Sequence, residues 1–275
     1  MRGFQQRWIW ATVVVAACFL CPSFVRGADD TTPSKEQIKT FLLKAKVVAS
    51  KQSGKGITSP WRLTLSDGTI THDASFQAVD EHKPMATLAS GRTEMNFVDS
   101  YKYNIAAYEV AEMVGFDDMM PVYVEPSWQG NPGSLSWWLP VKMDEEERRK
   151  QKLDLPDPDA WNNQMYKIRV FDQLVYDADP NLTNVLVGQD FKLWRVDFSR
   201  AFRLYKELQN PDDRSHCDRQ LFEKLKALDA NEVTVKTKRY LNKKDEVKAL
   251  MPRRDKIVEH FQQLIAAKGE KEVLY

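Results

Sequence analysis

The stretch Asp179–Arg200, DPNLTNVLVGQDFKLWRVDFSR, carries the strongest functional signal in this chain. Asp179 is followed five residues later by Asn184, and Asp197 comes thirteen residues after that asparagine. Carboxylate and amide oxygens are the side-chain ligands that suit Mg²⁺ in proteins. The three residues are therefore candidates for one shared site, provided that the fold brings them together.

The residues between Asn184 and Asp197 predict a way of bringing them together. Val185–Val187 and Lys192–Phe198 read as two short strands, and the turn Gly188-Gln189-Asp190 joins them. A hairpin returns the chain to its starting point, so Asp197 is expected beside Asn184.

A second interpretation assigns the same side chains to turns, where Asp and Asn are common for purely local reasons. In that case Asp177, Asp179 and Asn181 end a helix, Asp190 belongs to the hairpin turn, and Asp197 marks the end of a strand.

The first 27 residues are expected to be a signal peptide that is removed on export. Arg2 and Arg7 precede the apolar run Trp8–Leu20, and Val25-Arg26-Gly27 offers small residues before Ala28. This arrangement is typical of secretory signals, so a periplasmic or secreted protein is expected. Two alternatives remain open: an uncleaved signal that anchors the chain in a membrane, or a lipid on Cys18 after the lipobox-like Val15-Ala16-Ala17.

Composition excludes several classes of protein. The whole chain of 275 residues has a net charge of +1, and removal of the signal leaves 37 basic and 39 acidic residues. Such a balance gives no argument for binding nucleic acid or an anionic membrane. After cleavage no transmembrane span is expected, and Cys217 is the single cysteine, which excludes an internal disulfide and a cysteine-rich zinc site.

Periodicity predicts an α+β chain in which a strand-rich part precedes a helical part. The expected divisions are the signal peptide 1–27, a strand-rich lobe 28–141, a connector 142–158 and a helical lobe 159–275. The expected helices are 36–49, 101–115, 159–176, 217–228, 233–241, 243–250 and 252–267. The expected strands are 61–65, 69–71, 74–80, 122–125 and 134–139, besides the hairpin described above.

This order of elements resembles the protein-kinase-like superfamily. The resemblance rests on Asn104–Gly115, Val170–Asn184 and Trp194–Phe202. It is greatest to compact, atypical members, namely HipA-like kinases, phosphoinositide kinases and secretory-pathway kinases. It implies a two-lobed fold with a small strand-rich N-lobe and a helical C-lobe.

The resemblance also implies roles for particular residues. Asp179 matches the catalytic Asp that takes the proton of the acceptor hydroxyl, Asn184 a metal ligand, and Asp197 the metal ligand of Asp-Phe-Gly. Lys83 resembles the lysine that contacts the phosphates, although an exposed lysine at the end of a strand reads equally well. The implied ligands are ATP and Mg²⁺ or Mn²⁺, and the implied reaction is phosphoryl transfer to a hydroxyl of a protein or a small molecule.

Three departures from the kinase motifs keep other functions open. Pro180 follows the candidate base, Ser199 replaces the last Gly of Asp-Phe-Gly, and Asn104 stands where secretory kinases have a Glu, for which Glu109 and Glu94 are the candidate substitutes. These departures favour a catalytically inactive binding module. Transfer of a nucleotidyl group on the same fold is a further alternative.

The signal peptide gives a direct test. Mass spectrometry of the protein recovered from the exporting cell should find Ala28 as the first residue, because the small residues before it suit signal peptidase. A product that keeps Met1, or one that begins at a lipidated Cys18, would contradict this expectation.

Overall fold

The computed structural model describes residues 33–54, 60–88, 91, 93–209, 215–241 and 244–275. The chain divides into two units, Met1–Pro33 and Ser34–Tyr275, and all the helices and strands below belong to the second. The predicted signal peptide, residues 1–27, lies outside the described residues.

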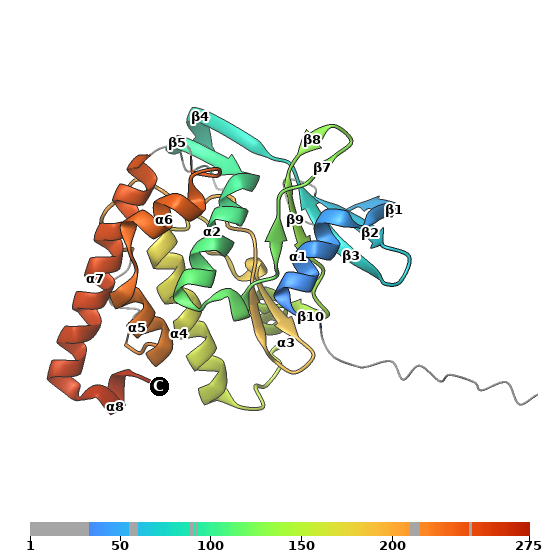
Figure 1. Cartoon of the computed structure of the whole chain (residues 1–275). Helices are drawn as coiled ribbons and strands as arrows, with labels where there is room; N and C mark the ends of the chain where they lie inside the picture. Colours follow the sequence, from blue (N-terminus) through green and yellow to red (C-terminus); the bar gives the residue numbers. More distant parts are fainter. Residues whose placement is uncertain (1–32, 55–59, 89–90, 92, 210–214, 242–243) are drawn as a thin grey trace, which may run out of the picture. The chain divides into compact units, whose positions relative to one another are not determined.

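An antiparallel sheet of five strands forms the N-terminal half (Figure 1). In spatial order its strands are β1 (Lys46–Gln52), β2 (Trp61–Ser66), β3 (Thr71–Gln77), β9 (Ser134–Trp137) and β6 (Tyr123–Val124). Two short strands, β7 (Ser127–Trp128) and β8 (Asn131–Pro132), form a separate hairpin.

The C-terminal half is mainly helical, which confirms the predicted mixed fold with strands first and helices last. Its helices are α3 (Glu145–Gln151), α4 (Pro158–Val175), α5 (Arg219–Ala227), α6 (Ala230–Thr237), α7 (Lys244–Lys268) and α8 (Glu270–Val273). A second antiparallel sheet in this half contains β10 (Val141–Asp144), β11 (Val185–Gly188) and β12 (Leu193–Arg195). Of the described helices, none is at once long enough and apolar enough to span a membrane.

Side chains alternate across the five-stranded sheet and give its two faces different chemistry. Leu63, Leu65, Ala74 and Phe76 are buried in one cluster with residues of α1 (Lys35–Lys44) and α2 (Tyr101–Val114). The alternate positions of the same strands are polar, and Arg62, Ser75 and Gln77 among them line a cavity described below.

Helix α2 joins the two halves. Ser100 caps its start by accepting a hydrogen bond from the N–H of Lys102, and Gly115 ends it in the left-handed conformation at a φ of 71°. The helix contacts β6 and β9 on one side and α5 and α6 on the other. It therefore fixes the position of the sheet relative to the helical half.

The predicted helix 36–49 is wrong at its C-terminal end. Helix α1 stops at Lys44, Ala45 is extended, and Val47 pairs with Leu65 on β2. Branched side chains such as Val47 and Val48 favour strands once a neighbouring strand offers hydrogen bonds.

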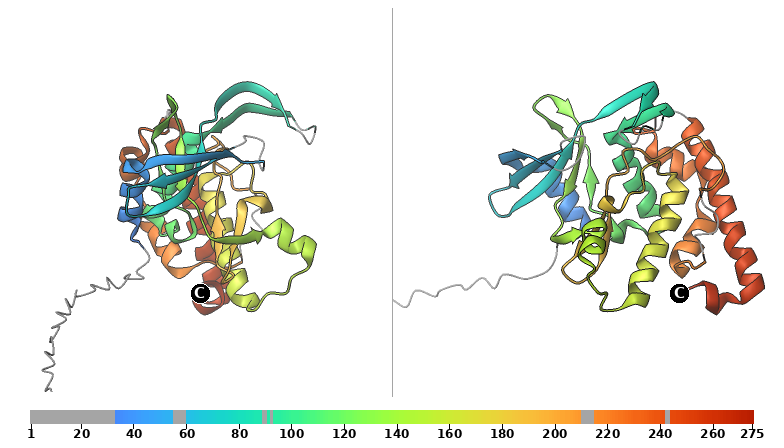
Figure 2. Two further views of the ribbon diagram at one scale, coloured as in Figure 1. Left: turned by 90° about the vertical axis from the view of Figure 1, so that its right-hand side faces the viewer. Right: turned by 180° about the vertical axis from the view of Figure 1, so that it is seen from behind.

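The sequence did not predict a long two-stranded ribbon. Its strands are β4 (Asp80–Thr87) and β5 (Thr93–Ser100), and the left view of Figure 2 shows them extending from the rest of the fold. The predicted strand 74–80 covers the end of β3 and the first residue of β4, and β4 continues through Pro84. A proline is tolerated here because a two-stranded ribbon leaves one edge of each strand unpaired.

Two helices expected at 243–250 and 252–267 are one helix, α7, with Pro252 inside it. The helix continues because residues on both sides of the proline are buried against the core, among them Leu250, Ile257 and Phe261. Packing on this scale outweighs the roughly 3 kcal/mol that an internal proline costs.

The charged run 144–150, inside the predicted connector 142–158, contains the helix α3, and its Glu145 is fully buried. Its carboxylate accepts hydrogen bonds from Arg148 at 2.6 and 2.9 Å and from Arg149 at 2.7 Å. Two guanidinium groups thus compensate the burial of this charge.

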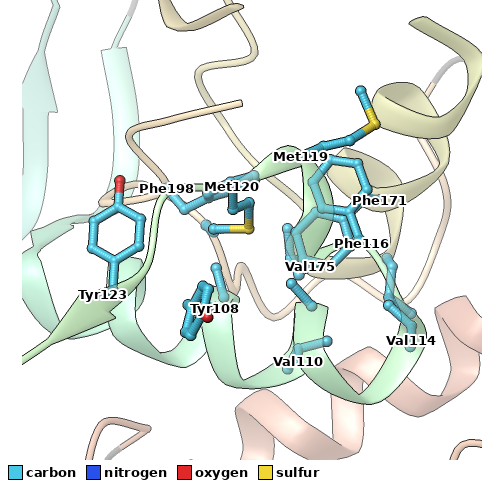
Figure 3. Packing of buried hydrophobic residues seen from close by; sticks show 14 of the residues in the cluster. Tyr108, Val110, Val114, Phe116, Met119, Met120, Tyr123, Phe171, Val175 and Phe198 are labelled. Atoms are coloured by element: carbon cyan, nitrogen blue, oxygen red, sulfur yellow. The ribbon is translucent and has the colours of Figure 1, made fainter. Parts of the chain in front are cut away.

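Aromatic residues connect the helical half to the stretch that contains Asp197 (Figure 3). Phe116 stacks on Phe171 of α4 with a centroid separation of 4.2 Å, and Phe171 meets Phe198 edge to face at 5.4 Å. All three side chains are fully buried. The residue after Asp197 is therefore fixed in the core.

Arg195, the last residue of β12, is also fully buried. Its Nε donates to Asp172 Oδ1 of α4 at 3.1 Å, and its Nη2 donates to Asp177. Burial raises the pKa of both carboxyl groups, that of Asp177 to about 7, while the charge of Arg195 opposes the rise. One cation is thus shared between two buried acids.

This network predicts the effect of removing its cation. Arg195→Met should lower the free energy of unfolding by about 3–5 kcal/mol at pH 8, because two carboxylates lose their buried partner. The loss should shrink toward pH 5, where the folded protein can protonate those carboxyls, since their folded-state pKa lies above the value of about 3.9 in the unfolded chain. Urea denaturation at both pH values measures the difference.

Arg219→Met is the matched control, because Arg219 pairs with Glu270 at the surface and both side chains are about half exposed. It should cost less than about 1 kcal/mol. Equal losses in the two variants would contradict the importance given to Arg195.

Candidate functional site

A cavity of about 850 Å³, here called the central cavity, lies between the five-stranded sheet and the second sheet. From the five-stranded sheet, its lining includes Arg62, Ser75, Gln77, Tyr123, Ser134 and Ser136. From the helical half, it includes Lys142, Asp144, Asn184, Leu186, Val196 and Asp197. Two of the three residues singled out by the sequence therefore line one cavity.

Asp197 follows β12 in the left-handed backbone region, with a φ of 60°. Aspartate is one of the few residues other than glycine that visits this region at modest cost. The N–H of Ser199 approaches Asp197 Oδ1 at 3.4 Å. The turn directs the Asp197 side chain to the cavity while Phe198 enters the core.

Asn184 reaches the same cavity from the start of the hairpin. It ends a short 3-10 helix, Leu182–Asn184, in which the N–H groups of Thr183 and Asn184 donate to the Asn181 side chain. The carbonyl of Asn184 accepts from the N–H of Val196 at 3.0 Å, so the residue beside Asp197 is tied to Asn184. The predicted hairpin therefore brings Asp197 beside Asn184, as expected.

Asp179 lies next to Asn184 but is not among the residues that line the central cavity. Its carbonyl lies 3.5 Å from Asn184 Nδ2, and its own N–H donates to Asp177 Oδ1 at 3.0 Å. The carboxylate is 48% exposed and lies 3.9 Å from Arg200 Nη1. It is thus held by its backbone and open to a molecule arriving from solvent.

The structure does not bring Lys83 to the central cavity. This lysine lies on β4 of the ribbon, is about half exposed, and donates to Glu81 at 2.6 Å. Its placement matches the alternative of an exposed strand lysine. A role toward phosphate stays a prediction that this position does not support.

Gln77, a residue not singled out from the sequence, lies in the cavity wall. It ends β3, and its Oε1 accepts from Asn104 Nδ2 of α2 at 2.7 Å. The two residues form a neutral amide pair between β3 and α2, and the candidate substitutes Glu94 and Glu109 are not part of it.

The polar alternation along β3 was the available signal for Gln77. Asp73, Ser75 and Gln77 alternate with Ala74 and Phe76, which marks one face of the strand as polar. The sequence could not show that this strand, and not β4, borders the site.

Arg62 is a cation of the cavity lining that already has partners. Its Nε donates to Asp73 Oδ2 at 2.7 Å, and its guanidinium lies 4.4 Å from the ring centre of Trp138. Trp138 also lines the central cavity. Trp137 also contributes to the lining but stacks on His72 with a centroid separation of 3.4 Å.

A third carboxylate lies near Asp197. Asp99 is largely buried, and its Oδ1 has no hydrogen-bond partner among the described residues. Burial raises the pKa of Asp99. The hydrogen bond with Ser199 and the charge of Arg200 oppose this rise, and the negative charge of Asp197 adds to it.

The donor set fits a magnesium or manganese ion that also binds phosphate. Asp197 offers carboxylate oxygens and Asn184 an amide oxygen, both from the lining of one cavity. No cluster of three or more His, Cys, Asp or Glu side chains suited to a metal occurs in the described part of the chain. Mg²⁺ commonly uses one or two protein ligands and takes the others from phosphates and water.

No protein-family model matches this chain, and no curated protein is similar to it in sequence. Solved structures are similar in fold. A hydra Fam20 structure with sugar has a TM-score of 0.59 at 14% identity, with 87% of this chain and 91% of that chain covered. The Golgi casein kinase with Mn/ADP bound has a TM-score of 0.60 at 13% identity, with 87% and 78% covered.

The Helicobacter pylori proinflammatory kinase CtkA gives a TM-score of 0.51 at 10% identity, and 82% of this chain covers 98% of that chain. At such low identities the similarity establishes the fold and nothing finer. The chain has the protein-kinase-like fold of atypical, compact kinases, as the order of its elements and the motifs around Asp179, Asn184 and Asp197 predicted.

Proposed function

We propose that this protein is a phosphotransferase that uses ATP and a divalent metal ion to modify a hydroxyl group. The observation that carries the proposal is the meeting of Asn184 and Asp197 in the lining of one cavity, with Asp179 held beside Asn184. The arrangement occurs in a kinase-like fold, and a solved structure of similar fold was determined with Mn/ADP bound.

In this proposal Asp197 and Asn184 hold the metal, and Asp179 acts on the acceptor. Bound metal neutralises charge that develops on the transferred phosphoryl group. Asp179 orients the acceptor hydroxyl and takes its proton as the new oxygen–phosphorus bond forms and the bond to the β-phosphate oxygen breaks. Arg200, 3.9 Å from the Asp179 carboxylate, limits the directions in which that carboxylate can turn.

A binding module without catalytic activity is the second candidate. The Gln77–Asn104 pair favours it, because kinases need both members of the lysine–glutamate pair in place for full activity. Nucleotidyl transfer would use the same metal ligands. Mass spectrometry of the acceptor distinguishes the three by a phosphoryl gain, a nucleotidyl gain or no gain.

The acceptor is a protein or a small molecule, and nucleic acid is not proposed because the mature chain has nearly balanced charges. We also propose that the protein acts after export, in the periplasm or outside the cell. That proposal rests on the N-terminal sequence alone.

Binding of nucleotide provides the first test. Calorimetry of the chain lacking residues 1–27 should detect ATP in the presence of Mn²⁺. Asp197→Ala should abolish this metal-dependent binding, because it removes the carboxylate ligand. Its midpoint of thermal unfolding without ligand should stay within a few degrees of the wild type, since the turn is also held by backbone and ring contacts.

Asp159→Ala, at an exposed position in the first turn of α4, is the control for loss of one negative charge. It should bind Mn–ATP like the wild type. A strongly destabilised Asp197→Ala protein that still binds nucleotide would show that Asp197 has a structural role instead.

Asp179 and Asn184 should give different losses. Asp179→Asn keeps the shape of the side chain but removes the proton acceptor, so turnover should fall roughly 10²–10⁴-fold with ATP binding retained. Asn184→Ala removes a metal ligand and should raise the Mn²⁺ concentration needed for half-maximal activity. A kinetic titration with both variants measures these effects, and an Asp179→Asn enzyme with the wild-type rate would exclude Asp179 as the base.

A further inference from the structure

The metal-binding position of Asp197 depends on an unusual backbone conformation that neighbouring residues must hold. Its φ of 60° is in the left-handed region, which is unfavourable for a residue with a side chain. A conformation of this kind persists when surrounding groups fix the residues on both sides of it. Contacts from other elements must therefore fix this turn.

Asn104 of α2 makes the most specific of these contacts. Its Oδ1 accepts from the N–H of Phe198 at 2.6 Å, directly after Asp197. Its Nδ2 donates to Gln77 Oε1 at 2.7 Å and lies 3.4 Å from Ser134 Oγ. The residue is 1% exposed, so water cannot replace these bonds.

An amide matches both of the partners that this position has in the structure. A backbone N–H needs an acceptor, and the Gln77 oxygen needs a donor, and only Asn or Gln offers both on one short planar group. A glutamate at this position could accept but not donate. The hydrogen-bonding groups of Asn104 and Gln77 are thus complementary. The two residues differ from the kinase pattern together, as one pair.

A second contact fixes the same turn. The carbonyl of Ser199 accepts from the N–H of Ser100, the residue that caps α2, at 2.8 Å. Helix α2 therefore holds the turn at two points, Phe198 and Ser199, and Asn104 provides the one that lies next to Asp197.

We propose that Asn104 is a positioning residue that holds Asp197 in its metal-binding conformation and takes over, with Gln77, the place of the lysine–glutamate pair of kinases. This proposal rests on the proposed function, since it assigns Asp197 to a metal. Because the pair carries no charge, it connects α2 to the metal site without contributing a cation to the phosphates.

Three variants separate the bond of Asn104 Oδ1 from the bonds of Nδ2. Asn104→Leu removes both kinds. Asn104→Asp keeps the acceptor for Phe198 N–H, and Gln77 can turn its amide to donate to the new carboxylate. Gln77→Leu removes the nearer partner of Nδ2 and leaves Ser134 Oγ.

Two measurements distinguish positioning from general stability. In Asn104→Leu without ligand, hydrogen exchange of the Phe198 amide should accelerate about tenfold or more, while amides in the centre of α4 keep wild-type protection. Calorimetry should show the Kd for Mn–ATP raised about tenfold or more. Asn104→Asp should stay closer to the wild type in both, and Gln77→Leu should leave the Phe198 amide protected.

If Asn104→Leu does not fold, Asn104→Ser provides the same comparison, because its hydroxyl is one bond shorter than the asparagine amide. A wild-type protein that binds no Mn–ATP would overturn the proposed function and the metal-binding part of this proposal together. A wild type that binds, with Asn104→Leu or Asn104→Ser binding equally well and Phe198 still protected, would overturn the role of Asn104 alone.

Discussion

The guanidinium group of Arg195 has no exposure to solvent and bonds to several of the segments that build the site. It bonds to Asp172 on α4, to Asp177 just before the candidate base, and to the carbonyl of Val196 just before Asp197. It also lies 3.5 Å from the carbonyl of Asn184. One buried cation thereby fixes the relative positions of the three segments that carry Asp179, Asn184 and Asp197.

Burying this network is costly, and the fold compensates by using almost every donor of the guanidinium. Two carboxylates and two carbonyls accept from it, and its planar group lies 4.7 Å from the ring centre of Phe198. The same ring packs on Phe171 of α4. Electrostatic and aromatic contacts thus act on the same turn, so the position of Asp197 is decided well inside the protein and not at its surface.

The wall of the central cavity that the five-stranded sheet provides has no lysine among its described residues. Gln77 and Asn104 connect the sheet to α2 through neutral groups, and the cation Arg62 is engaged by Asp73 and Trp138. The carboxylates of Asp99 and Asp197 lie near each other.

The sequence by itself determined the features that depend on neighbours in the chain. The spacing from Asn184 to Asp197 predicted a hairpin because strand pairing over so short a distance needs only a turn, and α2 and α4 were evident from apolar periodicity and from Gly115. The end of α1 and the continuation of α7 through Pro252 were decided by packing, which local propensity does not contain. The ribbon of β4 and β5 was missed because its strands carry little alternation and include a proline.

Only the tertiary structure decided which side chains share the site. Lys83 and Gln77 are six residues apart, yet one lies on an exposed ribbon and the other in the cavity wall, because the chain leaves the five-stranded sheet between them. Asn104 accepts a hydrogen bond from Phe198, which is 94 residues away in the sequence. Arg195 donates hydrogen bonds to aspartates of two other segments. Contacts of this kind depend on how the elements pack together, so no motif or periodicity in the sequence could have indicated them.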